Sequence, residues 1–130
     1  LPSYKVLSTD KLYTTSNVGI GTSAPAYDLD VVGDIYASGT VTQASDARLK
    51  SNLELISQPI EKITKLHGYT YDMYDNRRTG LIAQEVLDVL PEAVVGSAER
   101  GYGLAYGDMI GLLVEAIKKL NERITILENN

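Results

Sequence analysis

The chain has 130 residues, 44% of them hydrophobic, and a formal net charge of −5, which suits one small domain with an elongated extension. Nucleic acid and anionic membranes attract clustered Lys and Arg, so this acidic balance excludes both as expected partners. The absence of Cys excludes disulfides and thiolate chemistry, and no strong donors have metal-ligand spacing, so we expect no metal and no cofactor.

Residues 1–44 form the first predicted domain, a β-rich segment that is low in charge and rich in Gly, Ser, Thr, Val and Tyr. Strands this short gain stability by pairing with another chain, so we expect intertwined oligomerisation of this segment. The predicted strands, separated by Gly or Pro, lie at residues 4–7, 17–20, 29–32, 34–37 and 40–42.

A glycine-rich stretch from Gly19 to Ala24 fits the loose pattern of a dinucleotide-binding loop. That loop must open a helix, but Pro25 follows and the next residues are typical of a strand. We therefore interpret these glycines as turn residues.

Residues 45–130 form the second predicted domain, which mixes α and β elements, so the fold class is α+β. Pro near a start and Pro after an end indicate two short helices, at residues 59–66 and 84–90. Alternation and β-forming residues predict strands or extended segments at residues 67–74, 80–83, 93–95 and 102–106.

The last predicted element is a helix over residues 108–128, with Asp108 as its N-cap. Hydrophobic residues recur along it with spacings of 3 and 4, which is typical of a coiled coil, whereas packing on the chain's own domain is the alternative. We call these positions the seam: Ile110, Leu113, Ile117, Leu120, Ile124 and Leu127.

Two features of the seam predict different numbers of helices in the coiled coil. Ile at a and Leu at d favour a parallel dimer. Arg123 and Glu128, at g and e around Ile124 and Leu127, resemble a recurring pattern of trimeric coiled coils.

Candidate chemistry lies in the stretch Ser45-Asp46-Ala47-Arg48-Leu49-Lys50. Serine peptidases can use a neutral lysine amine as general base in place of histidine, and burial or a nearby cation such as Arg48 favours that form. Ser45 would be the nucleophile and Lys50 the base, although this spacing alone is common by chance. His67, the single histidine, stands in a strand-like run, where a structural role is expected.

A series of blocks beginning with this stretch resembles the intramolecular chaperone auto-processing domain of endosialidase-type tailspikes, phage tail fibres, neck appendages and myelin regulatory factor. The resemblance covers residues 45–130. Its further blocks are Leu66-His67-Gly68-Tyr69-Thr70-Tyr71, Gly80-Leu81-Ile82-Ala83-Gln84-Glu85-Val86 and Leu90-Pro91-Glu92-Ala93-Val94, followed by Tyr106 and the last helix. Residues 17–44 resemble the shaft segment that precedes such domains in fibre proteins, which implies that residues 1–44 are the end of a fibre shaft, an intertwined triple β-helix.

The resemblance implies a homotrimer that cuts the bond between Ala44 and Ser45 in its own chain, with Ser45 as nucleophile and Lys50 as base. It implies supporting roles for Asp46 and Arg48 in positioning the motif. Gln84 and Glu85 also match a family block, and we expect them to support the Ser45 loop or trimer contacts.

The predicted function is thus a C-terminal chaperone that trimerises a fibre or spike, sets its register and releases itself. The upstream shaft of the same chain is the expected partner, and the expected location is the virion, after assembly in the host cytoplasm. Two alternatives stay open: a non-cleaving trimerisation cap, and a receptor- or glycan-binding tip, against which the absence of Trp counts.

Overall fold

A computed structural model describes residues 12–130 of the chain, which divides into two compact units, residues 1–49 and 50–130. The strand predicted at residues 4–7 lies outside the described residues.

The first unit contains two short parallel strands, β1 (Val18–Ile20) and β2 (Leu29–Val31), at two of the predicted places. Val18 pairs with Leu29, so the two parallel strands are 11 residues apart along the chain. Gly21 takes a left-handed φ of 77° at the turn, and a Cβ there would come within 2.9 Å of the Val32 carbonyl oxygen. Gly21 is a turn residue, as expected, whereas the same prediction for Gly19 is wrong, because Gly19 lies in β1 opposite Asp30. No helix follows in residues 22–28.

The strands predicted at residues 34–37 and 40–42 are wrong for the single chain, which forms no β-ladder there. A strand of three or four residues needs a paired neighbour to persist. Within the described part of the first unit, nearly all of this stretch is exposed and no such neighbour is present.

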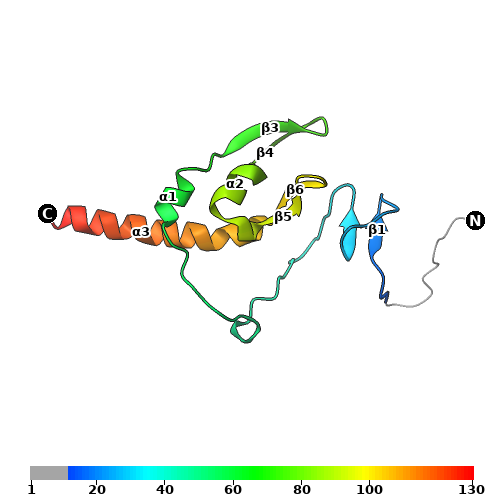
Figure 1. The fold of residues 1–130 in the computed structure, drawn as a ribbon, viewed down its shortest axis with the longest axis horizontal. Helices are drawn as coiled ribbons and strands as arrows, with labels where there is room; N and C mark the ends of the chain where they lie inside the picture. Colours follow the sequence, from blue (N-terminus) through cyan, green and yellow to red (C-terminus); the bar gives the residue numbers. More distant parts are fainter. Residues whose placement is uncertain (1–11) are drawn as a thin grey trace, which may run out of the picture. The chain divides into compact units, whose positions relative to one another are not determined.

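The second unit is a mixed α and β domain, as predicted, built around three helices: α1 (Pro59–Ile63), α2 (Ala83–Val89) and α3 (Ile110–Glu128). Figure 1 shows α1 and α2 packed beside the first half of α3, whose C-terminal end extends past α1. A small cluster of buried side chains joins α2 to α3: Val86, Val89, Leu90, Ala93, Met109 and Leu112.

Two antiparallel hairpins flank these helices. The first pairs β3 (Tyr69–Met73) with β4 (Asn76–Gly80), and the second pairs β5 (Val94–Ser97) with β6 (Gly101–Leu104). The prediction of a strand at residues 80–83 is therefore wrong. Tyr74 and Asp75 both take positive φ angles, 51° and 65°, and this two-residue turn starts the return strand at Asn76.

The entry into α3 also differs from the prediction that Asp108 is the N-cap. A 3₁₀ turn, η3 (Tyr106–Met109), precedes the helix, and Met109 occupies the cap position without a side-chain hydrogen bond. Met109 is buried in the core, so packing rather than a polar cap determines where the helix begins.

Candidate functional site

The predicted motif forms a short exposed turn, η1 (Ala47–Leu49), a 3₁₀ helix. Asp46 organises this turn, because its Oδ1 accepts the Arg48 N–H at 2.8 Å and its carbonyl oxygen accepts the Leu49 N–H at 3.0 Å. Asp commonly stabilises such turns by bonding the backbone two residues on. The local sequence therefore accounts for the turn.

The Arg48 guanidinium also bonds the Asp46 carboxylate through two nitrogens, at 2.7 and 3.1 Å. This pairing holds the pKa of Asp46 below its usual value and raises that of Arg48. The positive charge of Arg48 is therefore already balanced by the Asp46 carboxylate in the single chain.

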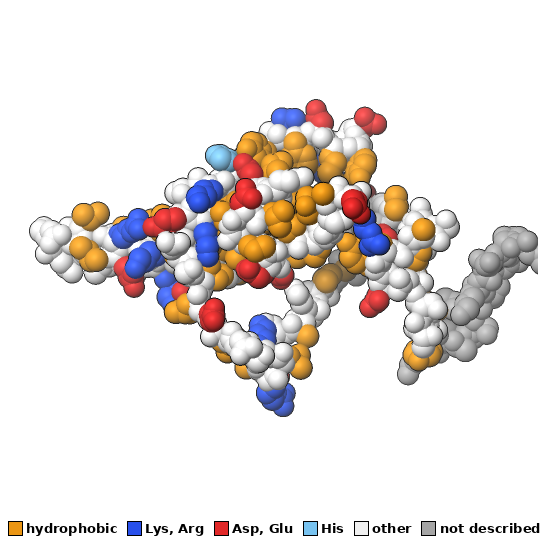
Figure 2. All heavy atoms as spheres, viewed as in Figure 1, with side chains coloured by type: hydrophobic (Ala, Val, Ile, Leu, Met, Phe, Trp, Pro, Cys, Tyr) orange, Lys and Arg blue, Asp and Glu red, His pale blue; other side chains and the backbone are white. Residues whose placement is uncertain are grey.

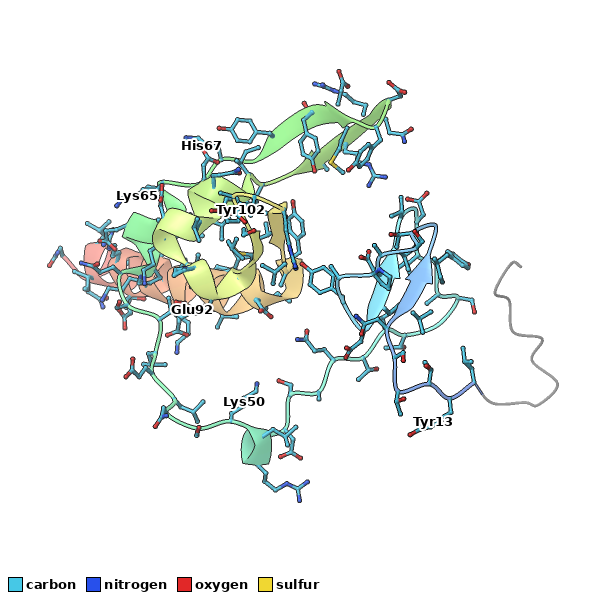
Figure 3. All side chains as sticks on the ribbon, turned by 45° about the vertical axis from the view of Figure 1, so that its right-hand side comes forward. Tyr13, Lys50, Lys65, His67, Glu92 and Tyr102 are labelled. Atoms are coloured by element: carbon cyan, nitrogen blue, oxygen red, sulfur yellow. The ribbon has the colours of Figure 1, made fainter. Side chains whose placement is uncertain are left out.

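Ser45 and Lys50 stand on either side of this turn, and both are exposed. The boundary between the two units falls after Leu49, so the two residues belong to different units. Figure 3 labels Lys50 on the extended segment that follows η1. The proposed dyad therefore rests on the motif and on the resemblance.

Glu85, on the first turn of α2, makes contacts that link α2 to the start of β3. Its Oε1 accepts the Tyr69 hydroxyl at 3.1 Å and lies 2.9 Å from His67 Nδ1, whereas its buried Oε2 has no hydrogen-bond partner among the described residues. The hydrogen bond to Glu85, with some burial, raises the pKa of Tyr69. The His67 contact agrees with the structural role expected for this residue.

Gln84, the neighbouring block residue, is exposed and lies on the rim of a tyrosine-rich groove of about 480 Å³. Tyr71, Tyr102 and Tyr106 line this groove. The Tyr106 hydroxyl accepts the Leu81 N–H at 3.0 Å and so fixes the chain between β4 and α2.

Sequence reasoning missed both of these polar arrangements. The partners of Glu85 are 16 and 18 residues away, and Tyr106 is 25 residues from Leu81, so no local spacing indicates the contacts. The one available signal was the use of nine Tyr with no Phe or Trp, because a tyrosine can bury its ring and still bond through its hydroxyl.

Within residues 12–130 there is no group of three potential metal ligands. None of the helices in that range is both long and apolar enough to cross a membrane.

Comparisons with known proteins agree with the resemblance inferred from the sequence. Residues 45–95 match a peptidase family described as chaperone of endosialidase. The chain is 35% identical over 114 residues to the long tail fiber protein Gp37 of Enterobacteria phage K3, a match that covers 75% of the chain and 9% of that protein.

Two eukaryotic relatives show the same similarity. Myelin regulatory factor homolog 1 of Caenorhabditis elegans is 38% identical over 99 residues, covering 64% of the chain and 11% of that protein. An uncharacterized membrane protein of Dictyostelium discoideum is 34% identical over 137 residues, covering 91% of the chain and 8% of that protein. The chain thus spans about a tenth of the length of the curated relatives that it matches.

Proposed function

Because residues 45–95 match the chaperone-of-endosialidase family, we propose that this chain is the self-releasing C-terminal chaperone of a fibre protein. Three copies associate through the seam, align the upstream segments and then cut the bond between Ala44 and Ser45. Similarity to phage long tail fibers supports the proposal that the whole protein is a tail fibre or spike of a virion. Its assembly in the host cytoplasm is part of the same proposal.

One observation carries the association step: the seam side chains stay 47–72% exposed although α3 already packs on its own domain. The packing uses a different face of the helix, formed by Met109, Leu112 and Ala116, which are 5%, 0% and 4% exposed. Figure 2 shows hydrophobic side chains at the surface near the C-terminal end of α3. A helix that is apolar on two faces needs a second partner.

The number of copies rests on the resemblance to a homotrimeric family. In the single chain, Arg123 of the trimer-like pattern pairs with Glu61 of α1, with 3.7 Å between the Arg123 Nη2 and Glu61 Oε1 atoms. An interchain pair between Arg123 and Glu128 would therefore compete with this exposed contact, which is worth little.

Trimerisation through α3 would assist the upstream segment in a simple way. β1 and β2 have three residues each and cannot hold a register alone. A helical bundle forms from local contacts and is fast, whereas interchain β pairing is slow. Three joined helices raise the effective concentration of the three attached segments and bring equivalent residues to the same level.

Cleavage would proceed within the motif in two steps. The Ser45 Oγ attacks the Ala44 carbonyl carbon, its proton passes to the neutral Lys50 amine, and the bond between Ala44 and the Ser45 nitrogen breaks as that nitrogen takes the proton. Water then hydrolyses the Ala44 ester. Lys50 is exposed in the single chain, so assembly would have to supply the burial that favours a neutral amine, and cleavage would follow trimerisation.

Denaturing gel electrophoresis of freshly folded protein tests this proposal. Cleavage should convert the 130-residue chain into pieces of 44 and 86 residues. Ser45→Ala and Lys50→Ala should each give whole chains in a folded trimer, and the matched controls Ser51→Ala and Lys62→Ala should still be cut. A Lys50→Ala chain that splits at the same bond would refute the dyad.

A non-cleaving trimerisation cap is the second candidate. The pairing of Arg48 with Asp46 favours it, since this pairing removes the cation nearest in sequence to Lys50. The cap would give a trimer with a single band at full length, whatever residue stands at position 45.

A further inference from the structure

An apolar hollow of about 280 Å³ lies in the second unit, next to the seam residue Leu113. Five hydrophobic side chains line it, from α1, the segments around it and α3: Ile63, Leu66, Leu81, Met109 and Leu113. His67 and Gly68 complete the wall, and His67 Nδ1 is already in contact with the Glu85 carboxylate of the same domain. The volume is below the range of about 300–1,000 Å³ that is usual for small-molecule sites, and it suits protein side chains.

Val114, the residue after Leu113, is a hydrophobic side chain that the chain's own domain leaves 47% exposed. With Ile110 at heptad position a, Val114 occupies position e, directly beside the seam. Positions e and g of a coiled coil often carry Glu or Lys. A valine at e therefore indicates an apolar neighbour in the assembly.

The two sides of the seam differ in what already covers them. On the g side, Met109 and Ala116 are buried by the domain of the same chain, and Met109 also lines the hollow. On the e side, Val114 stays open. In a parallel coiled coil the e side of one helix faces the g side of the next helix. The open side of one copy would therefore face the hollow of a neighbouring copy.

The residues at positions g and e of α3 agree with this arrangement. In a parallel coiled coil each g residue lies opposite the e residue of the following heptad in the neighbouring helix. The resulting pairs are Met109 with Val114, Ala116 with Asn121, and Arg123 with Glu128. The first pair is apolar, the second joins a small residue to a polar one, and the third has opposite charges. A second copy of this chain, parallel and in register, thus matches the hollow.

We propose that Val114 of one chain docks in the hollow of a neighbouring chain. The inference rests on the proposed trimer and adds to it a contact between the folded domain of one chain and the last helix of the next. Ile63, Leu66 and Leu81 come together around the hollow only in the folded domain. Docking would therefore couple the folding of each domain to the association of the three chains.

Cysteine cross-linking provides a direct test, because the natural chain has no Cys. One full-length chain carries Val114→Cys, and a second chain, made heavier by a tag, carries Gly68→Cys in the wall of the hollow. No atom lies within 4 Å of a Cβ at Gly68, so the cysteine fits there. Both chains also carry Ser45→Ala to stay whole, and they are folded together and treated with a short bismaleimide.

We expect a covalent pair of unlike chains on a denaturing gel. A matched control replaces Val114→Cys with Glu122→Cys, at an exposed site on the side of α3 away from the seam, and should give at least about tenfold less of this product. A trimer in which the cross-link forms no better than in the control would overturn the docking contact and leave the proposed function intact. Chains that stay monomeric at all concentrations would overturn both.

The Val114→Ala variant supplies a second measurement, by sedimentation equilibrium in the Ser45→Ala background. At an exposed helix site this change is neutral or slightly stabilising, because Ala forms helix better than Val. In the hollow it removes apolar contact from all three copies, and the association constant should fall at least about a hundredfold. Ile126→Ala, at another exposed site of α3 outside the seam, is the control and should leave the association constant unchanged. An unchanged association constant for Val114→Ala would overturn the docking contact.

Discussion

The Ile117→Ala variant distinguishes between two states of the seam: an exposed face of a single helix, and a face buried between chains. Ile117 is 65% exposed in the single chain, and exposed substitutions change the free energy of unfolding by no more than about 0.5 kcal/mol. If the seam is buried in a trimer, the same substitution costs about 2–5 kcal/mol in each chain.

The effect is threefold in a trimer, because each copy contributes one Ile117. The loss is then about 6–15 kcal/mol per trimer, which lowers the association constant by at least about four orders of magnitude. Leu112→Ala is the contrasting variant: Leu112 is 0% exposed and faces the chain's own core. It should destabilise each chain by about 2–5 kcal/mol and leave the seam residues in place.

Sedimentation equilibrium and thermal unfolding over a range of concentrations measure the two effects. In a Ser45→Ala background the parent should have three times the chain mass of 14.2 kDa and a Tm that rises with concentration. Ile117→Ala should lose the trimer mass, whereas Leu112→Ala should lower Tm and keep that mass at concentrations where the chain is folded. Lys118→Ala, on the outer face, should resemble the parent. The seam would be refuted if Ile117→Ala left both mass and Tm unchanged.

Three further predictions concern the domain itself. Gly80→Ala should lower the free energy of unfolding by about 0.5–1.5 kcal/mol in urea titrations, because its Cβ would displace the Tyr106 hydroxyl from its hydrogen bond with the Leu81 N–H. Gly68→Ala, into open space, is the control, and equal losses for both would contradict the packing argument. Tyr69→Phe should destabilise the domain at neutral pH by removing the bond to Glu85. Glu85 raises the pKa of Tyr69 above 10.0, so the difference in free energy of unfolding between the parent and Tyr69→Phe is fully present below pH 10.0. This difference should fade as pH rises through the raised pKa, and a difference that stayed constant with pH would be inconsistent with the bond. Replacing Tyr74 and Asp75 with Asn and Gly should stabilise the first hairpin by about 1 kcal/mol, because both positions have positive φ, and unchanged unfolding curves would contradict the assigned turn.

Local patterns predicted the elements whose stability depends on neighbouring residues. Pro59 opens α1 and Pro91 follows α2, as their positions in the sequence indicate. The spacing of the seam residues predicted the helix up to Glu128, because a repeat of 3 and 4 matches a helical turn. The short turn at Asp46 also depends on contacts within three residues.

Elements that depend on long-range contacts were predicted less well. The left-handed turn at Tyr74 and Asp75 lacks the usual Asn-Gly signature, so the start of β4 was misplaced. Burial of Met109 overrode Asp108 as the helix cap.

The amino-acid sequence by itself determined the family resemblance, the candidate residues Ser45 and Lys50, and the apolar repeat of the last helix. Only the tertiary structure decided which face of α3 the domain covers and that Glu85 bonds His67 and Tyr69. The reason is physical: a helical repeat and a short motif are local properties of the chain. Burial and hydrogen bonding between distant residues depend on how the elements pack.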